Sequence, residues 1–217
     1  WLHHSLTALA ADLAARGVSL ILRRGDAGRI VPETAAALGA GLIVWNRRYD
    51  DRAVAVDTAV KAALKSDGRT ARSFNGALMV EPWEVLTGSG GPYKVFTPFW
   101  RAARPLALSR GPIPAPTLAG AQVAAPSDAL ADWALLPVKP DWAGGLRAAW
   151  TPGEAGALAR ARAFVAGPLK GYAARRNLPA VEGTSRLSPH LRFGEISPRR
   201  VWSLVADRLA DEPGLHD

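Results

Sequence analysis

The first third of the chain alternates between segments whose apolar residues follow helical periodicity and segments that are continuously apolar. Four leucines recur at the spacing of one helix face: Leu2, Leu6, Leu9 and Leu13. Arg16-Gly17 is typical of a helix end, and residues 18–22 form a short apolar run that predicts a strand. We therefore expect the chain to open with a helix followed by a strand.

Two further pairs of helix and strand are expected before residue 75. Asp26 can cap a second helix that ends at Gly39, and residues 41–45 predict the next strand. A longer helix is expected from about residue 50 to 65, followed by a strand near residues 72–74. The expected buried positions of this helix are Val56, Val60, Ala63 and Leu64. The alternation indicates an α/β fold with a doubly wound parallel sheet, of which we expect the opening strand to be missing.

Proline dominates the pattern from residue 87 to 150. The stretch opens with the Gly-rich run Thr87–Gly91, which lacks the Lys-Ser/Thr and the following helix of a Walker loop, so we expect a turn there. Eight later prolines share this stretch: Pro98, Pro105, Pro112, Pro114, Pro116, Pro126, Pro137 and Pro140. Because proline removes a helix hydrogen bond, we expect no long helix here, only a connector.

Helical periodicity returns after residue 150. Thr151-Pro152-Gly153-Glu154 fits a capping box with proline at the first helical position, and the expected apolar stripe is Leu158, Ala161 and Val165. A second helix is expected to begin near Ser197-Pro198. Its expected buried residues are Val201, Leu204, Val205 and Leu209. The last third is therefore predicted to be the beginning of an all-helical piece.

Composition narrows the functional classes. The 217 residues carry a formal charge of +8 and include no cysteine, which excludes a disulfide-stapled scaffold, a thiolate metal site and a cysteine nucleophile. His3-His4 lacks a partner at helical spacing, so we expect no metal site. With neither a long apolar run nor a signal-peptide pattern, we expect a soluble, cytoplasmic protein. The chain begins at Trp1 and its only methionine is Met79, so we expect a piece of a longer protein.

Nearly all of the excess charge lies between residues 160 and 200. This segment holds nine basic side chains, eight of them arginine, against Glu182 and Glu195, which gives it a net charge of +7 and leaves +1 for the rest. A concentrated positive field attracts polyanions, and the arginine fork suits phosphate. A solvated basic face without a partner is the alternative interpretation.

Within this basic segment, residues 183–190 read Gly-Thr-Ser-Arg-Leu-Ser-Pro-His. Three hydroxyl groups and one arginine lie within five residues, after a glycine that frees the backbone. Hydroxyl and backbone N–H donors beside a fixed cation are suited to a pyrophosphate group. An ordinary loop with a serine cap is the other interpretation, and composition alone favours it slightly.

This loop is part of a longer run of residues that resembles a known sequence signature. Residues 172–179, Tyr-Ala-Ala-Arg-Arg-Asn-Leu-Pro, and their continuation through residues 183–199 strongly resemble the FAD-binding signature of the DNA photolyase/cryptochrome family, in its bacterial form. Residues 45–49, Trp-Asn-Arg-Arg-Tyr, resemble a segment of that family's antenna domain. Residues 93–100, Tyr-Lys-Val-Phe-Thr-Pro-Phe-Trp, resemble the start of its interdomain linker. The three matches are collinear and cover most of the chain.

The resemblance implies a truncated Rossmann-like antenna domain over residues 1–86, a linker over 87–150 and the start of the helical FAD-binding domain over 151–217. It implies that the FAD phosphates are held by Thr184, Ser185, Arg186, Leu187 and Ser188. It also implies that Tyr172 contacts FAD and that Arg176 contacts the DNA backbone. Most of the family's helical domain is absent from this chain, so the fragment alone is expected to bind FAD poorly and to be inactive.

The implied reaction is light-driven splitting of cyclobutane pyrimidine dimers in UV-damaged DNA, with FAD carrying the chemistry. We identify no catalytic acid or base, and we expect a monomer when the protein is full length. Folate-using members carry Asn-Glu where this chain has Arg52-Ala53, so the second antenna chromophore is left open between a folate, a deazaflavin, another flavin and none. The alternatives are a cryptochrome-type blue-light receptor and, outside the family, a non-enzymatic nucleic-acid-binding module.

Overall fold

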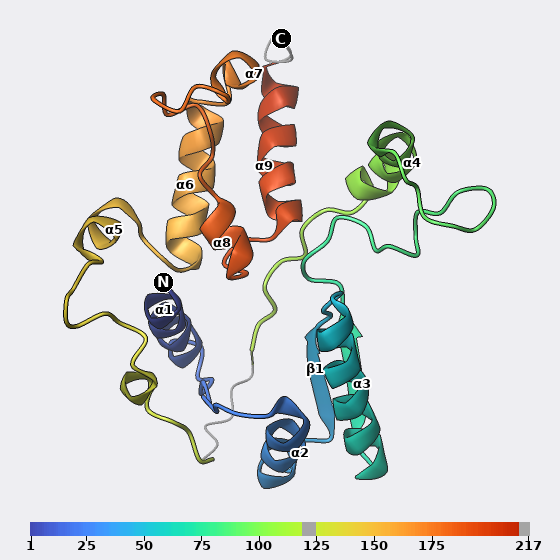
Figure 1. The fold of residues 1–217 in the computed structure, drawn as a ribbon, viewed down its shortest axis with the longest axis vertical. Coiled ribbons are helices and arrows are strands. Elements are labelled where there is room, and N and C mark those ends of the chain that lie inside the picture. The colour runs from blue at the N-terminus through green and yellow to red at the C-terminus, as the bar shows by residue number, and fades with distance from the viewer. Residues whose placement is uncertain (119–124, 213–217) are drawn as a thin grey trace. The chain divides into compact units, whose positions relative to one another are not determined.

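The computed structural model describes residues 1–118 and 125–212, which divide into two compact units (Figure 1). One unit, here the α/β unit, comprises residues 9–77 and 117–141. The other, here the helical unit, comprises residues 1–8, 78–116 and 142–217. The first helix, α1 (Leu2–Ala14), contributes residues to both units.

The α/β unit is built on two parallel strands, β1 (Leu42–Asn46) and β2 (Thr70–Phe74), in a register that pairs Leu42 with Thr70. Helix α3 (Asp51–Ser66) connects them, and α2 (Ala27–Ala37) precedes β1. Parallel strands need such a crossover, so the arrangement confirms the predicted α/β class with a parallel sheet.

Local capping explains where these helices begin. The Asp26 side chain accepts a hydrogen bond from the Arg29 backbone N–H at 3.2 Å, and Asp50 accepts one from the Ala53 N–H at 2.9 Å. Each carboxylate satisfies a donor that the helix itself leaves unpaired. The expected cap at Asp26 is thereby confirmed.

The core of this unit lies between the two helices and one face of the sheet. Ala35, Val60 and Leu64 are buried there, and Ile43 and Trp45 of β1 pack against them. The expected burial of Val60 and Leu64 is confirmed, whereas Val56 and Ala63 are only half-buried. On the other face of the sheet, the apolar side chains Leu42, Val44 and Phe74 are more than half exposed.

The strand expected over residues 18–22 was wrong. These residues are irregular and lie outside the sheet, although they are partly buried as their apolar character suggests. The Leu22 N–H donates to Ser127 Oγ at 3.0 Å, and the Leu22 carbonyl accepts from the Asp128 N–H at 2.7 Å. Residues 18–22 therefore have the partial burial expected of a strand. The backbone groups of Leu22, however, bond to residues 127–128 instead of to a neighbouring strand.

The regular elements of the remaining described chain are helical. One short 3-10 turn, η1 (Leu130–Trp133), lies in the α/β unit. The helical unit contains α4 (Phe96–Leu108), α5 (Gly144–Ala149), α6 (Glu154–Ala166), α7 (Tyr172–Arg175), α8 (Ser188–Arg192) and α9 (Pro198–Asp211). No helix among the described residues has the length and apolar character needed to cross a membrane.

Helix α4 corrects the expectation that proline excludes a long helix between residues 87 and 150. It is 13 residues long and contains both Pro98 and Pro105. Pro98 lies in the first turn, where a backbone N–H has no partner within the helix and its loss costs little. Burial of Ala103 and Ala107 stabilises the segment around Pro105.

The Thr87–Gly91 run forms the expected turn, closed by a hydrogen bond from the Thr87 N–H to the Gly91 carbonyl at 2.8 Å.

The capping box expected at Thr151 was also wrong. Helix α6 begins at Glu154, and its N-cap is Gly153, whose φ of 105° favours glycine. A Cβ on Gly156 would lie 1.9 Å from the Thr151 carbonyl oxygen, so the chain folds back over the first turn of α6. That path places the Gly153 N–H against Glu195 instead of against the Thr151 hydroxyl.

The core of the helical unit joins α6, α8 and α9. Ala157, Ala161, Leu187 and Ile196 are buried together, with Val201 and Leu204 of α9 packed against them. In Figure 1, α6 and α9 run side by side with α8 against one end of the pair. The Ser197 side chain caps α9 by accepting from the Arg200 N–H, which confirms the expected helix start.

The expected apolar stripes are only partly confirmed. In α6, Ala161 is buried as expected, but Leu158 and Val165 are half-buried and the remaining buried positions are Ala157 and Phe164. The four positions expected to be buried on α9 are all half-buried: Val201, Leu204, Val205 and Leu209.

Because Leu64 is fully buried at 0% exposure, Leu64→Ala in the full-length protein should lower the free energy of unfolding by about 2–5 kcal/mol. Urea denaturation followed by circular dichroism measures this. Val54→Ala is the matched control, since Val54 lies on the same helix, is 45% exposed and should change stability little. Equal losses in the two variants would contradict the assigned core.

Candidate cofactor and nucleic-acid site

The hydroxyl-rich loop of residues 184–188 leads into α8, whose first residue is Ser188. Thr184 and Ser188 are exposed and Ser185 is half-buried. None of these three hydroxyl groups hydrogen-bonds to another described group, and the same holds for the backbone N–H groups of residues 184–186. The loop thus carries several polar donors that the described fold does not use.

Gly183 fixes the loop against α7. A Cβ at this position would lie 2.8 Å from the Arg175 carbonyl oxygen and 2.7 Å from its Cβ, so the close approach requires glycine. As a result, the loop starts beside the helix that carries Tyr172. The structure therefore brings together two predicted site segments that are twelve residues apart.

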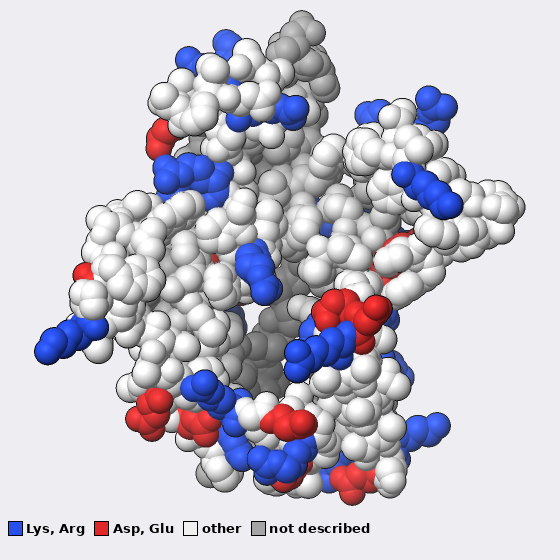
Figure 2. All heavy atoms as spheres, in the orientation of Figure 1, with Lys and Arg blue, Asp and Glu red and all other residues white. Residues whose placement is uncertain are grey.

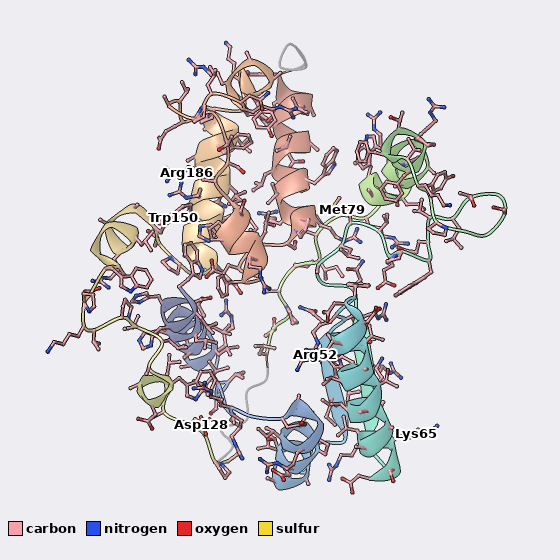
Figure 3. All side chains as sticks on the ribbon, in the orientation of Figure 1. Arg52, Lys65, Met79, Asp128, Trp150 and Arg186 are labelled. Carbon is pink, nitrogen blue, oxygen red and sulfur yellow. The ribbon has the colours of Figure 1, made fainter. Side chains whose placement is uncertain are left out.

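Arg186 and Leu187 point into different environments. Arg186 has a φ of 52°, and its guanidinium lies 4.9 Å from the centre of the Trp150 ring and 2.9 Å from a Glu182 carboxylate oxygen. Figure 3 shows Arg186 and Trp150 beside α6. The Leu187 side chain is 2% exposed and belongs to the core. Any contact of Leu187 with a ligand is therefore made by its backbone.

Trp150 is a residue that sequence reasoning did not assign to the site. The Arg160 guanidinium lies 4.8 Å from its ring centre, so two cations contact one indole ring. Trp150 also meets Trp1 edge-on, with ring centroids 5.5 Å apart. No spacing rule connects these positions, and the sequence offers no signal that would have found the cluster.

Tyr172 and Arg176 lie on one short segment. Tyr172 is 37% exposed, meets Phe164 edge-on at 5.7 Å between ring centroids, and has the Arg176 guanidinium 5.9 Å from its ring centre. Arg176 is exposed, as are the nearby cations Lys170 and Arg175. Figure 2 shows Lys and Arg side chains gathered over α6 and α7 with few acidic groups among them.

Behind the loop, Glu195 forms a buried polar network. Its Oε2 lies 2.6 Å from His190 Nδ1, and its Oε1 accepts from the Gly153 N–H at 2.8 Å and from the Trp1 indole N–H at 3.0 Å. His190 is 0% exposed and Glu195 is also buried. The sequence signal for this network is a histidine and a glutamate five residues apart in an otherwise basic segment.

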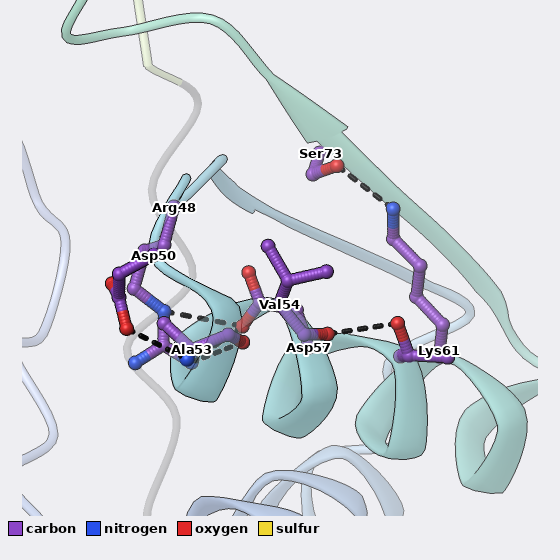
Figure 4. Close-up of polar contacts among 8 residues, drawn as sticks. Arg48, Asp50, Ala53, Val54, Asp57, Lys61 and Ser73 are labelled. Atoms are coloured by element: carbon purple, nitrogen blue, oxygen red, sulfur yellow. Dashed lines mark hydrogen bonds and ion pairs between the residues drawn. The ribbon is translucent and has the colours of Figure 1, made fainter.

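The segment that resembles an antenna-domain motif follows β1 in the α/β unit. Arg47 donates to the Ser73 carbonyl at 2.8 Å, and Arg48 pairs with Asp57 of α3 at 2.5 Å (Figure 4). Lys61 donates to Ser73 Oγ at 2.8 Å. These side chains fasten the carboxyl end of β1 to α3 and β2.

Burial of Asp57 acts to raise its pKa, but the hydrogen bonds and the positive charge of Arg48 outweigh that effect. The pKa of the Asp57 carboxyl therefore lies below its ordinary value of 3.8. Among the described residues, no cluster of three or more His, Asp and Glu side chains could hold a metal ion.

Comparison with known proteins agrees with this fold. The DNA photolyase family model matches residues 1–118. The chain is 49% identical over 203 residues to the deoxyribodipyrimidine photo-lyase of Agrobacterium fabrum, covering 93% of this chain and 42% of the relative. It is 34% identical over 214 residues to cryptochrome-1 of Arabidopsis thaliana, covering 94% of this chain and 30% of that protein.

A solved structure adds a match in three dimensions. A class III photolyase from Agrobacterium tumefaciens superposes with a TM-score of 0.91 at 47% identity, covering 98% of this chain and 44% of that one. The chain belongs to the DNA photolyase family, as the sequence resemblance predicted. It spans about two fifths of the length of the photo-lyase from Agrobacterium fabrum that it matches.

The lowered pKa of Asp57 leads to a pH-dependent prediction. A carboxyl whose folded pKa is depressed stabilises the fold above its unfolded pKa and loses that contribution as the pH falls through the folded value. In the full-length protein, Asp57→Asn should therefore lower the free energy of unfolding by about 1 kcal/mol at neutral pH, because Arg48 is half exposed and screened. The deficit should vanish as the pH falls below 3.8.

Urea denaturation at a series of pH values measures this difference. Asp12→Asn is the matched control, since Asp12 is exposed and its carboxylate makes no hydrogen bond to a described group. A deficit for Asp57→Asn that does not change with pH would contradict the assigned ion pair.

Proposed function

We propose that the full-length protein is a deoxyribodipyrimidine photo-lyase, which uses light to split cyclobutane pyrimidine dimers in DNA. The observation that carries this proposal is the donor-rich loop of residues 184–188 beside a basic surface, in a chain 49% identical to a photo-lyase. The 47% identity to a class III photolyase structure over 98% of the chain supports the same activity.

The loop fits the diphosphate of FAD. Thr184, Ser185 and Ser188 supply hydroxyl groups with no partner among the described residues, residues 184–186 supply backbone N–H groups, and Arg186 supplies a cation. Phosphate oxygens need such donors, and a guanidinium can contact two of them at once. Tyr172 borders the loop and offers an aromatic ring and a phenol to the same cofactor.

When bound, FAD supplies the light-driven electron transfer that opens the dimer. This chain's residues then have a binding and orienting role. The loop fixes the diphosphate end of the cofactor, and Arg186, held over Trp150, places its charge where phosphate would neutralise it. Glu182 competes for Arg186 from a solvent-exposed position, where an ion pair contributes little.

The basic surface is proposed to bind the damaged duplex. Arg176 is exposed beside Tyr172, and Lys170 and Arg175 extend the positive charge around it. A dimer that pairs poorly costs less to extrude from the stack than a normal base. A positive surface beside the cofactor loop would hold the DNA backbone during this step.

Along the chain, we propose that residues 1–86 form the antenna domain, residues 87–150 the linker, and residues 151–217 the start of the FAD-binding domain. A second chromophore, a folate or a deazaflavin, is proposed for the antenna domain, and the full-length protein is proposed to be a monomer. Arg52 is exposed and Ala53 is buried at the start of α3, and neither residue gives a specific signal for either chromophore.

The decisive experiment is to purify the full-length protein, record its absorption spectrum, and assay dimer repair in light and in darkness. A flavin spectrum and repair only in light are expected. Flavin without repair would instead assign the cryptochrome function, which the 34% identity to a plant cryptochrome keeps as the second candidate. Equal repair in light and darkness, or a protein without flavin, would contradict the proposal.

Removing a phosphate contact should weaken DNA binding without affecting the cofactor. In the full-length protein, Arg176→Ala should reduce affinity for dimer-containing DNA and lower the slope of log K against log salt by about 1. Fluorescence anisotropy at several salt concentrations measures both, and absorbance measures flavin content, which should not change. Arg52→Ala removes an exposed arginine outside the basic segment and is the matched control. Loss of flavin in Arg176→Ala would show that the residue is misassigned.

A further inference from the structure

The loop proposed to hold the cofactor cannot depend on its own helix for order. Helix α8 is only five residues long, and isolated helices shorter than about 12–15 residues are marginal in water. The position of residues 184–188 must therefore be set by tertiary contacts. These contacts include Gly183 against Arg175, Arg186 over Trp150, Leu187 in the core, and His190 against Glu195.

The Glu195 contacts are the polar part of this anchoring. The carboxylate joins three segments that are far apart in sequence: Trp1, the N-terminal end of α6 at Gly153, and α8 at His190. Both His190 and Glu195 are buried, so water cannot replace a lost partner. Leaving a buried polar group unpaired costs more than the net value of one hydrogen bond.

We assign the pair as a carboxylate that accepts a hydrogen bond from the imidazole. To donate to Glu195 Oε2, His190 must carry its proton on Nδ1, and the 2.6 Å separation is typical of a charge-assisted hydrogen bond. His190 Nε2 is buried without a hydrogen-bond partner among the described residues. A histidine whose proton moved to Nε2 would thus place a donor where the described structure offers no acceptor.

We infer that Glu195 is a positioning residue for the cofactor: through His190 and Gly153 it holds α8 against α6, and so holds the loop of residues 184–188 in the arrangement that grips a diphosphate. This rests on the proposed function. Glu195 itself is buried behind the loop and acts only through the residues it contacts. Its loss should therefore weaken binding of the diphosphate end of FAD and spare the flavin ring.

Glu195→Gln is the sharpest test because it keeps the shape of the side chain. The amide oxygen can still accept from Gly153 and Trp1, but the amide nitrogen faces His190 Nδ1, so either two donors oppose each other or the His190 proton moves to the unpartnered Nε2. In the full-length apoprotein, the affinity for FAD should fall about tenfold, because one hydrogen bond to a charged group is worth about that factor. The affinity for riboflavin should change less than about twofold, because riboflavin has no phosphate.

Fluorescence titration with FAD and with riboflavin measures the two affinities, and thermal unfolding is recorded alongside them. Glu154→Gln is the matched control, since Glu154 lies exposed in the first turn of α6 and should leave both affinities unchanged. Equal losses for FAD and riboflavin would show a general structural role and overturn the inference, as would equal FAD affinity in the two variants.

The wild-type protein distinguishes failure of the proposed function from failure of this inference. A wild type that binds no flavin contradicts both proposals. If the wild type binds FAD, the variants test the role of Glu195 alone. Should Glu195→Gln not fold, Trp1→Phe carries the test. It removes the indole donor at 3.0 Å and keeps an aromatic ring stacked on Phe193. FAD affinity should then fall about threefold with riboflavin affinity unchanged, and an unchanged FAD affinity would overturn the inference.

Discussion

A buried carboxylate is the interaction on which the helical unit depends. Glu195 accepts hydrogen bonds from a side chain, a backbone N–H group and an imidazole that come from three separate segments. Burying a charge is unfavourable unless such partners are supplied, so the three segments can only order together. The short helix α8, and with it the donor-rich loop, takes its position from this network and from the apolar cluster around Leu187.

Two kinds of polar group lie at the loop of residues 184–188 and behind it: those that are buried and bonded within the fold, and those that are not bonded within it. Those behind the loop, at His190 and Glu195, are buried and bonded to each other. Those on the loop, the hydroxyl groups of Thr184, Ser185 and Ser188, make no hydrogen bond within the described fold. One short segment therefore carries both a core leucine, Leu187, and the hydroxyl groups that we propose to bind the phosphates of FAD.

Much of the secondary structure was predictable because its determinants are local. The cap at Asp26, the end of α1 near Gly17 and the start of α9 at Ser197 each depend on residues within one turn. The errors arose where distant groups decided the outcome. Residues 18–22 bond to residues 127–128 instead of joining the sheet, and the N-cap of α6 moved to Gly153 because Glu195 takes its N–H group.

By itself, the sequence determined the fold class, the family and the concentration of charge between residues 160 and 200, since periodicity, motif and composition are properties of neighbouring residues. Only the tertiary structure decided which side chains surround the loop. Trp150 contacts Arg186 across 36 positions, and Trp1 reaches Glu195 across 194. Such contacts arise from how helices pack and from the need to pair every buried polar group, and no local spacing encodes them.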